Sequence, residues 1–119
     1  MATGTSYENF LIEVGDFVSV MGGVQSITGS APSTASVVLQ GIYGETFTVQ
    51  ARDCTSVQHT SGAAMSKNGK LFTTGDRVTA NGIVTAVTGS GVTAQVTVRL
   101  DESQLSVTVY AGSVHSNAA

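Results

Sequence analysis

The chain has little cysteine, proline, tryptophan and charge. Its 119 residues include one Cys (Cys54), one Pro and no Trp, and charged residues make up 11% of the sequence. A single Cys cannot form an intramolecular disulfide, so a small secreted scaffold held by disulfides is excluded. A typical soluble domain contains about 25% charged residues. We therefore expect a surface that is polar but carries few charges.

The small number of basic residues argues against nucleic acids and membranes as binding partners. Five Lys and Arg residues stand against eight Asp and Glu, for a net charge of −3. Proteins that bind nucleic acids present basic surfaces that displace counterions from phosphates, so we do not expect a nucleic-acid partner. A polybasic anchor is absent, and no segment approaches the ~18 consecutive apolar residues that cross a bilayer. We expect no membrane association.

Residues that favour β-strands are abundant. Val occurs 17 times and Thr 16 times, and 41% of the residues are hydrophobic. β-Branched side chains suit strands, and no stretch shows helical periodicity over three turns. The composition indicates an all-β fold with little or no helix.

A phrase of 16 residues occurs twice. GDFVSVMGGVQSITGS begins at Gly15 and GDRVTANGIVTAVTGS begins at Gly75, and 8 of the 16 positions are identical. The offset of 60 residues aligns further matches on both sides, which indicates two homologous units. We predict an N-terminal arm at 1–8, a first β-unit at 9–59, a linker at 60–68 and a second β-unit at 69–119.

Each unit of about 50 residues predicts four or five short strands. Asn81-Gly82 is a pair that type I′ hairpins prefer, so we expect a turn there, with Met21-Gly22 as its counterpart. Alternating apolar residues predict two more hairpins, SVVLQ with TFTVQA and AQVTVRL with QLSVTVY. Because a lone unit of this size is marginally stable, we expect a shared core or partner contacts. Tandem small SH3-like barrels and one pseudo-symmetric β-barrel or sandwich both fit.

The sequence offers few residues for chemistry. Gly15-Asp16 and Gly75-Asp76 are interpreted as turns in which the Asp carboxylate accepts backbone hydrogen bonds. Cys54 and His59 match no zinc spacing, so we expect a buried structural thiol. TGSG at 88–91 lacks the Lys and the following helix of a phosphate loop. We expect no enzyme activity, no catalytic residues, no metal site and no cofactor.

Candidate interface residues lie where the two copies differ. Phe17 stands where the second unit has Arg77, and aromatic and Arg side chains anchor many protein interfaces. The first unit and its arm hold most of the aromatics, while the basic residues cluster near the second unit. The predicted interface comprises Tyr7, Phe10, Phe17, Tyr43, Lys67, Lys70 and Arg77.

The beginning of the chain resembles the small head-decoration, or cement, proteins of tailed bacteriophages. The resemblance is carried by Met1-Ala2-Thr3, the apolar Phe10-Leu11-Ile12, Gly15-Asp16 followed by Val18, and Gly22-Gly23. It implies a non-enzymatic, all-β virion protein that binds the outer capsid lattice and stiffens it. The expected partners are the major capsid protein or another virion protein, and further copies of the chain in a homo-oligomer.

Two other functions remain open at this point. One is a head–tail connector or a tail or baseplate component. The other is a small-barrel module that binds nucleic acid or peptide, because GDRVTANGIV is similar to the start of KOW-like and Tudor-like barrels. The chain lacks the basic start of a secretory signal, so we expect synthesis in the host cytoplasm and a final location on the capsid surface.

Overall fold

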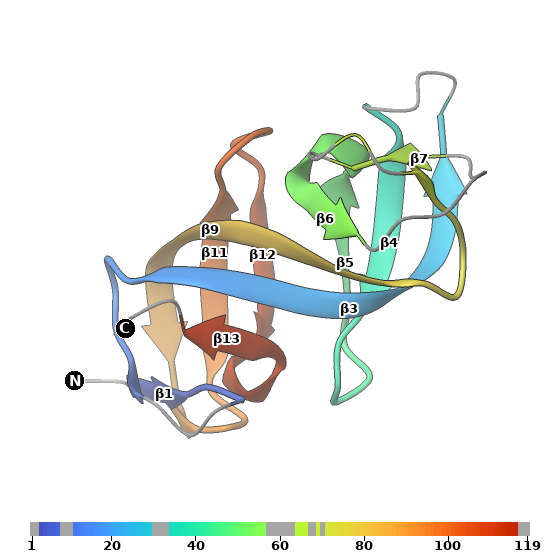
Figure 1. The fold of residues 1–119 in the computed structure, drawn as a ribbon. Helices are drawn as coiled ribbons and strands as arrows, with labels where there is room; N and C mark the ends of the chain where they lie inside the picture. Colours follow the sequence, from blue (N-terminus) through green and yellow to red (C-terminus); the bar gives the residue numbers. More distant parts are fainter. Residues whose placement is uncertain are drawn as a thin grey trace.

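The computed structural model of the chain describes residues 3–7, 11–29, 34–56, 64–66, 69 and 71–116. These residues form β-strands and two short 3-10 turns, so the expected all-β class is confirmed (Figure 1). No helix in these ranges is both long and apolar enough to cross a membrane.

The strands follow the repeat in the sequence. The first copy holds β1 (Thr3–Thr5), β2 (Leu11–Ile12), β3 (Phe17–Thr28), β4 (Ser36–Gln40), β5 (Thr46–Gln50), the 3-10 turn η1 (Ala51–Asp53) and β6 (Cys54–Ser56). The second copy holds β7 (Ala64–Met65), β8 (Leu71–Phe72), β9 (Arg77–Thr88), β10 (Ser90–Gly91), β11 (Gln95–Leu100), β12 (Ser106–Tyr110), η2 (Ala111–Ser113) and β13 (Val114–Ser116). The predicted arm at 1–8 and the predicted linker at 60–68 therefore each contain the first strand of a copy.

Two long strands cross the centre of the molecule. β3 and β9 have 12 residues each and pair antiparallel from Phe17 opposite Ile83 to Gly23 opposite Arg77. Val20 lies opposite Ala80, and these two residues occupy the same position of the repeat. An approximate two-fold axis therefore passes between them, and Figure 1 shows the pair spanning both halves of the molecule.

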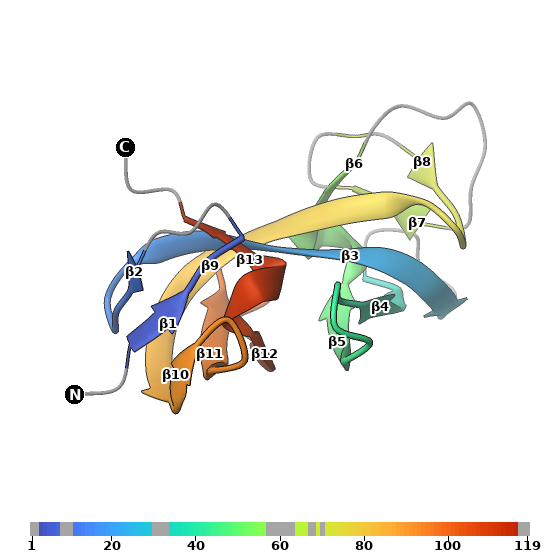
Figure 2. The ribbon, with the colours of Figure 1, turned by 90° about the horizontal axis from the view of Figure 1, so that it is seen from below.

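The two copies exchange strands around this crossing. β13 of the second copy pairs with the first half of β3, and β6 of the first copy pairs with the first half of β9. β11 pairs with the second half of β9, and β4 with the second half of β3. Each half of the molecule is thus built from strands of both copies, with β1–β2 and β7–β8 at opposite ends (Figure 2).

The hairpin expected at Asn81-Gly82 is wrong, as is its counterpart at Met21-Gly22. Both dipeptides lie inside uninterrupted strands. A Cβ on Gly82 would lie 2.5 Å from the carbonyl oxygen of Arg99, and one on Gly22 would lie 2.9 Å from that of Gln40. The glycines are needed because a neighbouring strand passes close to the backbone, and not because the chain turns.

The other two predicted hairpins are confirmed. β4 pairs with β5 and β11 pairs with β12, each antiparallel and without a register shift. Within β11 and β12 the alternating apolar residues point inward, as period two requires. The buried set in this hairpin is Val96, Val98, Leu100, Val107 and Val109.

The turns before the two long strands tie the copies together. Gly15 and Gly75 have φ of 97° and 91°, a conformation that glycine adopts readily. The amide of Gly15 donates to the carbonyl of Val84 (2.8 Å), and the amide of Gly75 donates to the carbonyl of Val24 (2.9 Å). Each turn is therefore bonded to the long strand of the other copy.

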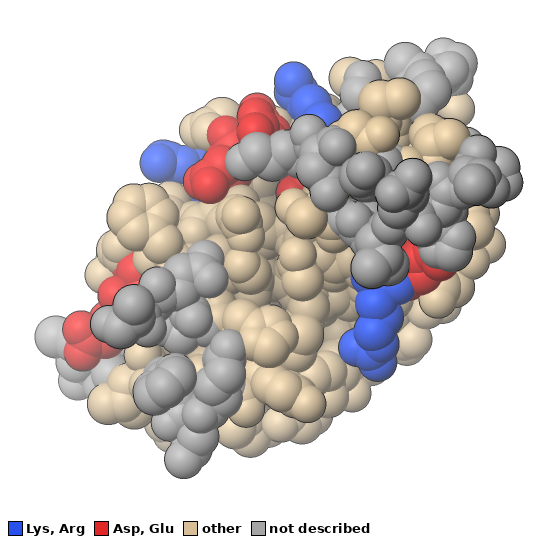
Figure 3. Space-filling model, in the orientation of Figure 1, with Lys and Arg blue, Asp and Glu red and all other residues tan. Residues whose placement is uncertain are grey.

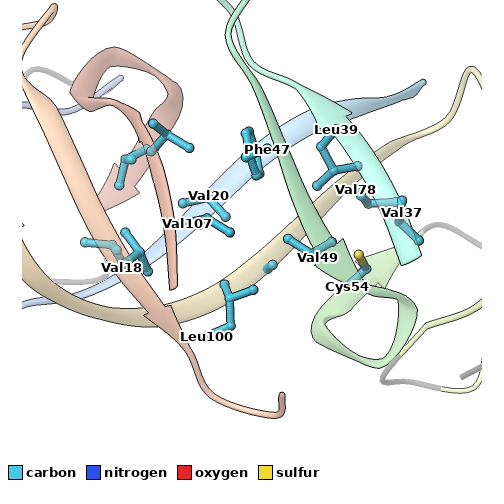
Figure 4. Packing of buried hydrophobic residues seen from close by; sticks show 14 of the residues in the cluster. Val18, Val20, Val37, Leu39, Phe47, Val49, Cys54, Val78, Leu100 and Val107 are labelled. Carbon is cyan, nitrogen blue, oxygen red and sulfur yellow. The ribbon is translucent and has the colours of Figure 1, made fainter. Parts of the chain in front are cut away.

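One hydrophobic core serves both copies. The main sheet runs in the order β12-β11-β9-β3-β4-β5, and its two outermost strands, β5 and β12, lie close to each other, so the sheet nearly closes into a barrel. Figure 4 shows buried side chains of this core between the hairpins β4–β5 and β11–β12 and the crossed strands β3 and β9. The residues it labels come from both copies: Val18, Val20, Val37, Leu39, Phe47, Val49, Cys54, Val78, Leu100 and Val107. The shared core explains how units of this size are stabilised.

Candidate functional site

The candidate site is the face of the crossed strands that points away from the core. Antiparallel register and period two place eight side-chain positions on this outer face: Phe17, Ser19, Met21 and Gly23 of β3, and Arg77, Thr79, Asn81 and Ile83 of β9. Phe17 is 65% exposed. Arg77 is the one charged residue of the eight.

Tyr7 extends the outer face. Its amide donates to the carbonyl of Val114 (2.9 Å), and its ring lies 5.2 Å from that of His115. His115 is opposite Ser19 across β13 and β3. Tyr7, in the turn after β1, is thus held against β13, the strand that pairs with the part of β3 next to Phe17, and both side chains are exposed.

The surface over this region carries little charge. Figure 3 has the orientation of Figure 1, with β3 and β13 toward the viewer, and shows uncharged surface in the middle with charged side chains nearer the edges. Interface cores are depleted of charged residues and enriched in aromatic ones, and an uncharged surface that exposes Phe17 has both properties.

Tyr43 lies elsewhere. It belongs to the turn between β4 and β5, where its ring packs edge-on against Tyr110 with centroids 5.9 Å apart. The same ring lies against the backbone of Gly112 in η2. Tyr43 therefore contacts the second copy while remaining 45% exposed, and it is not among the side chains of the outer face. Phe10, Lys67 and Lys70 of the predicted interface, and also His59, lie outside the described residues.

A pocket adjoins the Arg77 end of the outer face. Its volume is about 490 Å³, and it lies between β3, the turn joining β4 to β5, and the turn before β9. The lining residues are Gly23, Val24, Gln25, Gln40, Gly41, Ile42, Gly44, Gly75 and Arg77. Of the sequence-predicted residues, Arg77 alone lines it. The sequence did not predict the pocket. The one feature of the sequence that points to it is the glycine at position 23, because the equivalent position of the second copy, 83, is Ile.

The two repeated aspartates are confirmed as turn residues. The carboxylate of Asp16 accepts a hydrogen bond from the amide of Glu13 (2.9 Å), and that of Asp76 accepts one from the amide of Thr73 (2.8 Å). Within the described ranges, no group of three or more His, Cys, Asp or Glu residues is placed to hold a metal ion.

Cys54 is buried, as expected. Its Sγ contacts the carbonyl oxygen of Gln50 at 3.7 Å. Burial, and after it the negative charge of Asp53, raises the pKa of the thiol to about 12. Because the thiolate is the reactive form, Cys54 is inert at neutral pH.

The comparisons with known proteins do not extend this picture. The chain matches no protein family, no curated protein and no solved structure.

Proposed function

We propose that the chain is a virion structural protein, a decoration subunit that binds the assembled capsid of a tailed bacteriophage and stabilises it. The outer face is the docking surface, and the partner is the major capsid protein or another virion protein. The N-terminal resemblance to head-decoration proteins supports the class, and the exposed, nearly uncharged outer face supports the mode of binding. Location on the capsid surface and homo-oligomeric association belong to the same proposal.

The exposure of Phe17 is the observation that carries the proposal. A phenyl ring that is 65% exposed at the start of a paired strand adds little to the core, whereas aromatic anchors contribute much of the binding energy in interfaces. Many subunits that bind only the assembled lattice stabilise it by mass action, even when each contact is weak. The chain therefore acts by binding in a fixed ratio to capsid subunits and not by catalysing a reaction.

Co-sedimentation with capsids tests the proposal. We expect the purified chain to pellet with capsids that lack it, and Phe17→Ala to weaken this binding about tenfold or more. The free energy of unfolding of the variant is expected to change by less than about 0.5 kcal/mol, because the side chain is exposed. Val92→Ala is the matched control, since Val92 is an exposed residue outside the outer face.

Two results would contradict this assignment. If the unaltered chain stays in the supernatant with every capsid preparation, the decoration role is wrong. If Phe17→Ala pellets as the unaltered chain does, the docking surface lies elsewhere.

The pocket beside Arg77 favours one second candidate, a small-barrel module that binds peptide. A concave site next to an exposed sheet face is a common place for a peptide segment. Peptide binding and capsid decoration are compatible, because a decoration protein also recognises segments of its partner.

A further inference from the structure

The pocket lies where the two copies differ at a pair of facing positions on the outer face. Phe17 opposite Ile83 at one end of the outer face corresponds to Arg77 opposite Gly23 at the other. Two large apolar side chains are thus replaced by a cation and a residue without a side chain. The pocket forms at the Arg77–Gly23 end, where the space of an Ile side chain is left free.

The fold does not explain the glycine at position 23. Its φ is not positive, and a Cβ built on it meets no atom within 4 Å. Glycine in a strand interior costs roughly 0.5–1 kcal/mol relative to Ala. Gly22, by contrast, is required by the close approach of Gln40. Glycine inside a strand marks a bulge, a bend, or a place where a ligand or another backbone approaches closely. The bulge that follows Gly23 recurs after Ile83 in the second copy, so the bulge does not require glycine, and the approach of a ligand is the explanation that fits.

Arg77 gives the pocket a free positive charge. In the part of the chain that the structure describes, the Arg77 guanidinium makes no ion pair or hydrogen bond, and the residue is exposed. The five N–H donors of a guanidinium match a carboxylate in a bidentate arrangement. A carboxylate is therefore the ligand group that this end of the pocket fits.

The remaining lining suits a peptide backbone. Nε2 of Gln25 donates to Oε1 of Gln40 (3.2 Å), and Nε2 of Gln40 donates to the carbonyl of Gly44 (3.5 Å). Each of these amide groups has two hydrogens and uses one of them here. The second hydrogen of each is available for a carbonyl of a bound segment.

We propose that this pocket binds an Asp or Glu side chain in an extended peptide segment of the capsid partner. The inference rests on the proposed function, because the pocket continues the same docking surface. Six residues of strand, about 20 Å at ~3.3 Å per residue, separate Arg77 from Ile83, which is paired with Phe17. One partner surface can therefore place an acidic residue in the pocket and an apolar contact on Phe17.

A displayed library of random 12-residue peptides, selected on the purified full chain, tests this inference without any capsid. We expect the selected peptides to share an acidic residue. Changing that residue to its amide is expected to weaken binding about tenfold or more, as measured by fluorescence anisotropy. Arg77→Phe and Gly23→Ile, which install the residues of the other copy, are expected to weaken binding to a similar extent.

Val92→Ala is the control and is expected to leave peptide affinity unchanged, because Val92 is exposed but lies neither on the outer face nor in the pocket. Circular dichroism spectra, compared with that of the unaltered chain, are used to check that each variant is folded. The inference is overturned if no peptides are enriched, if they lack a common acidic residue, or if Arg77→Phe binds them equally well. Because the selection contains no capsid, this failure is distinct from a failure of capsid co-sedimentation, which concerns the proposed function alone.

Discussion

At the scale of single residues, Cys54 shows how position sets chemistry. The sequence contains Cys54 and His59 close together, a combination that occurs in nucleophilic and metal sites. In the structure the thiol begins β6, opposite Ala80 at the centre of the crossing, and is fully buried. Its pKa of about 12 favours the neutral thiol at physiological pH.

This pKa predicts a loss of stability in alkali. The ordinary pKa of the thiol is 9.0, so between pH 9 and 12 the unfolded chain binds fewer protons than the folded one. The free energy of unfolding should therefore fall by about 1.4 kcal/mol per pH unit in this range through Cys54 alone, and this contribution is fully present below pH 9. Urea titrations at several pH values measure it.

Cys54→Ala isolates the effect, because Tyr and Lys residues also titrate above pH 9. The variant is expected to be less stable than the unaltered chain below pH 9 but to lose less stability between pH 9 and 12. Equal slopes for the two proteins would show that the thiol ionises normally in the folded state, as would rapid alkylation of the native protein by iodoacetamide at pH 8.

At the scale of elements, the fold depends on β9 continuing through Asn81-Gly82 without a turn, because only a continuous strand can pair with both β3 and β11. Asn-Gly between alternating residues is a strong local signal for a hairpin, and it led to the wrong prediction here. The signal failed because a short window of sequence cannot show which strand passes the glycine. In the structure the passing strand is β11, and its Arg99 lies opposite Ile83, beside Gly82.

Gly82→Ala tests whether close approach is the reason for the glycine. We expect the free energy of unfolding to fall by about 1–3 kcal/mol, since the new methyl group would overlap backbone atoms of Arg99. Urea denaturation measures the change. We also expect faster amide hydrogen exchange in β11, because this strand has to move away from the new methyl group. A loss of stability without any change in the exchange of β11 would contradict the role of close approach.

Gly23→Ala is the control for this experiment. It is also in a long strand and not at positive φ, but its Cβ would meet nothing within 4 Å. We expect its stability to be unchanged or raised by up to about 1 kcal/mol. Equal destabilisation of the two variants would contradict the role assigned to close approach.

At the scale of the whole molecule, the exchange of strands makes the two copies interdependent. β3 has its partners β9 and β13 in the second copy, and β9 has its partners β3 and β6 in the first. The buried cluster draws on both copies. The molecule is 43 Å long and 24 by 23 Å across, and the paired strands β3 and β9 carry both the apolar end and the cationic end of the outer face.

Separate fragments 1–59 and 60–119 are therefore expected not to fold as monomers. Each fragment keeps one neighbour of its long strand, β4 or β11, but loses the partners from the other copy and about half of the buried cluster. Mixing them in equal amounts should restore the β-sheet circular dichroism and give a species with the mass of the whole chain. A fragment that gives a dispersed NMR spectrum as a monomer would show that the copies are independent barrels.

The sequence by itself determined what depends on neighbouring residues. Period-two alternation identified the hairpins β4–β5 and β11–β12, the Gly-Asp pairs identified the turns before β3 and β9, and the offset of 60 residues identified the two copies. The contrast between Phe17 and Arg77 also pointed to the outer face. These features follow from local geometry, which is encoded within a few residues.

Only the tertiary structure decided which copy each strand joins. Because the copies share one pattern, a strand finds the same local complementarity in its own unit and in the other, and the closure of a common core selects between them. The same closure makes Gly82 a point of close approach and not a turn residue, and it places the exposed ring of Tyr43 against Gly112 of the other copy. It also opened the pocket where Gly23 meets Arg77, because a pocket depends on side chains that distant segments bring together.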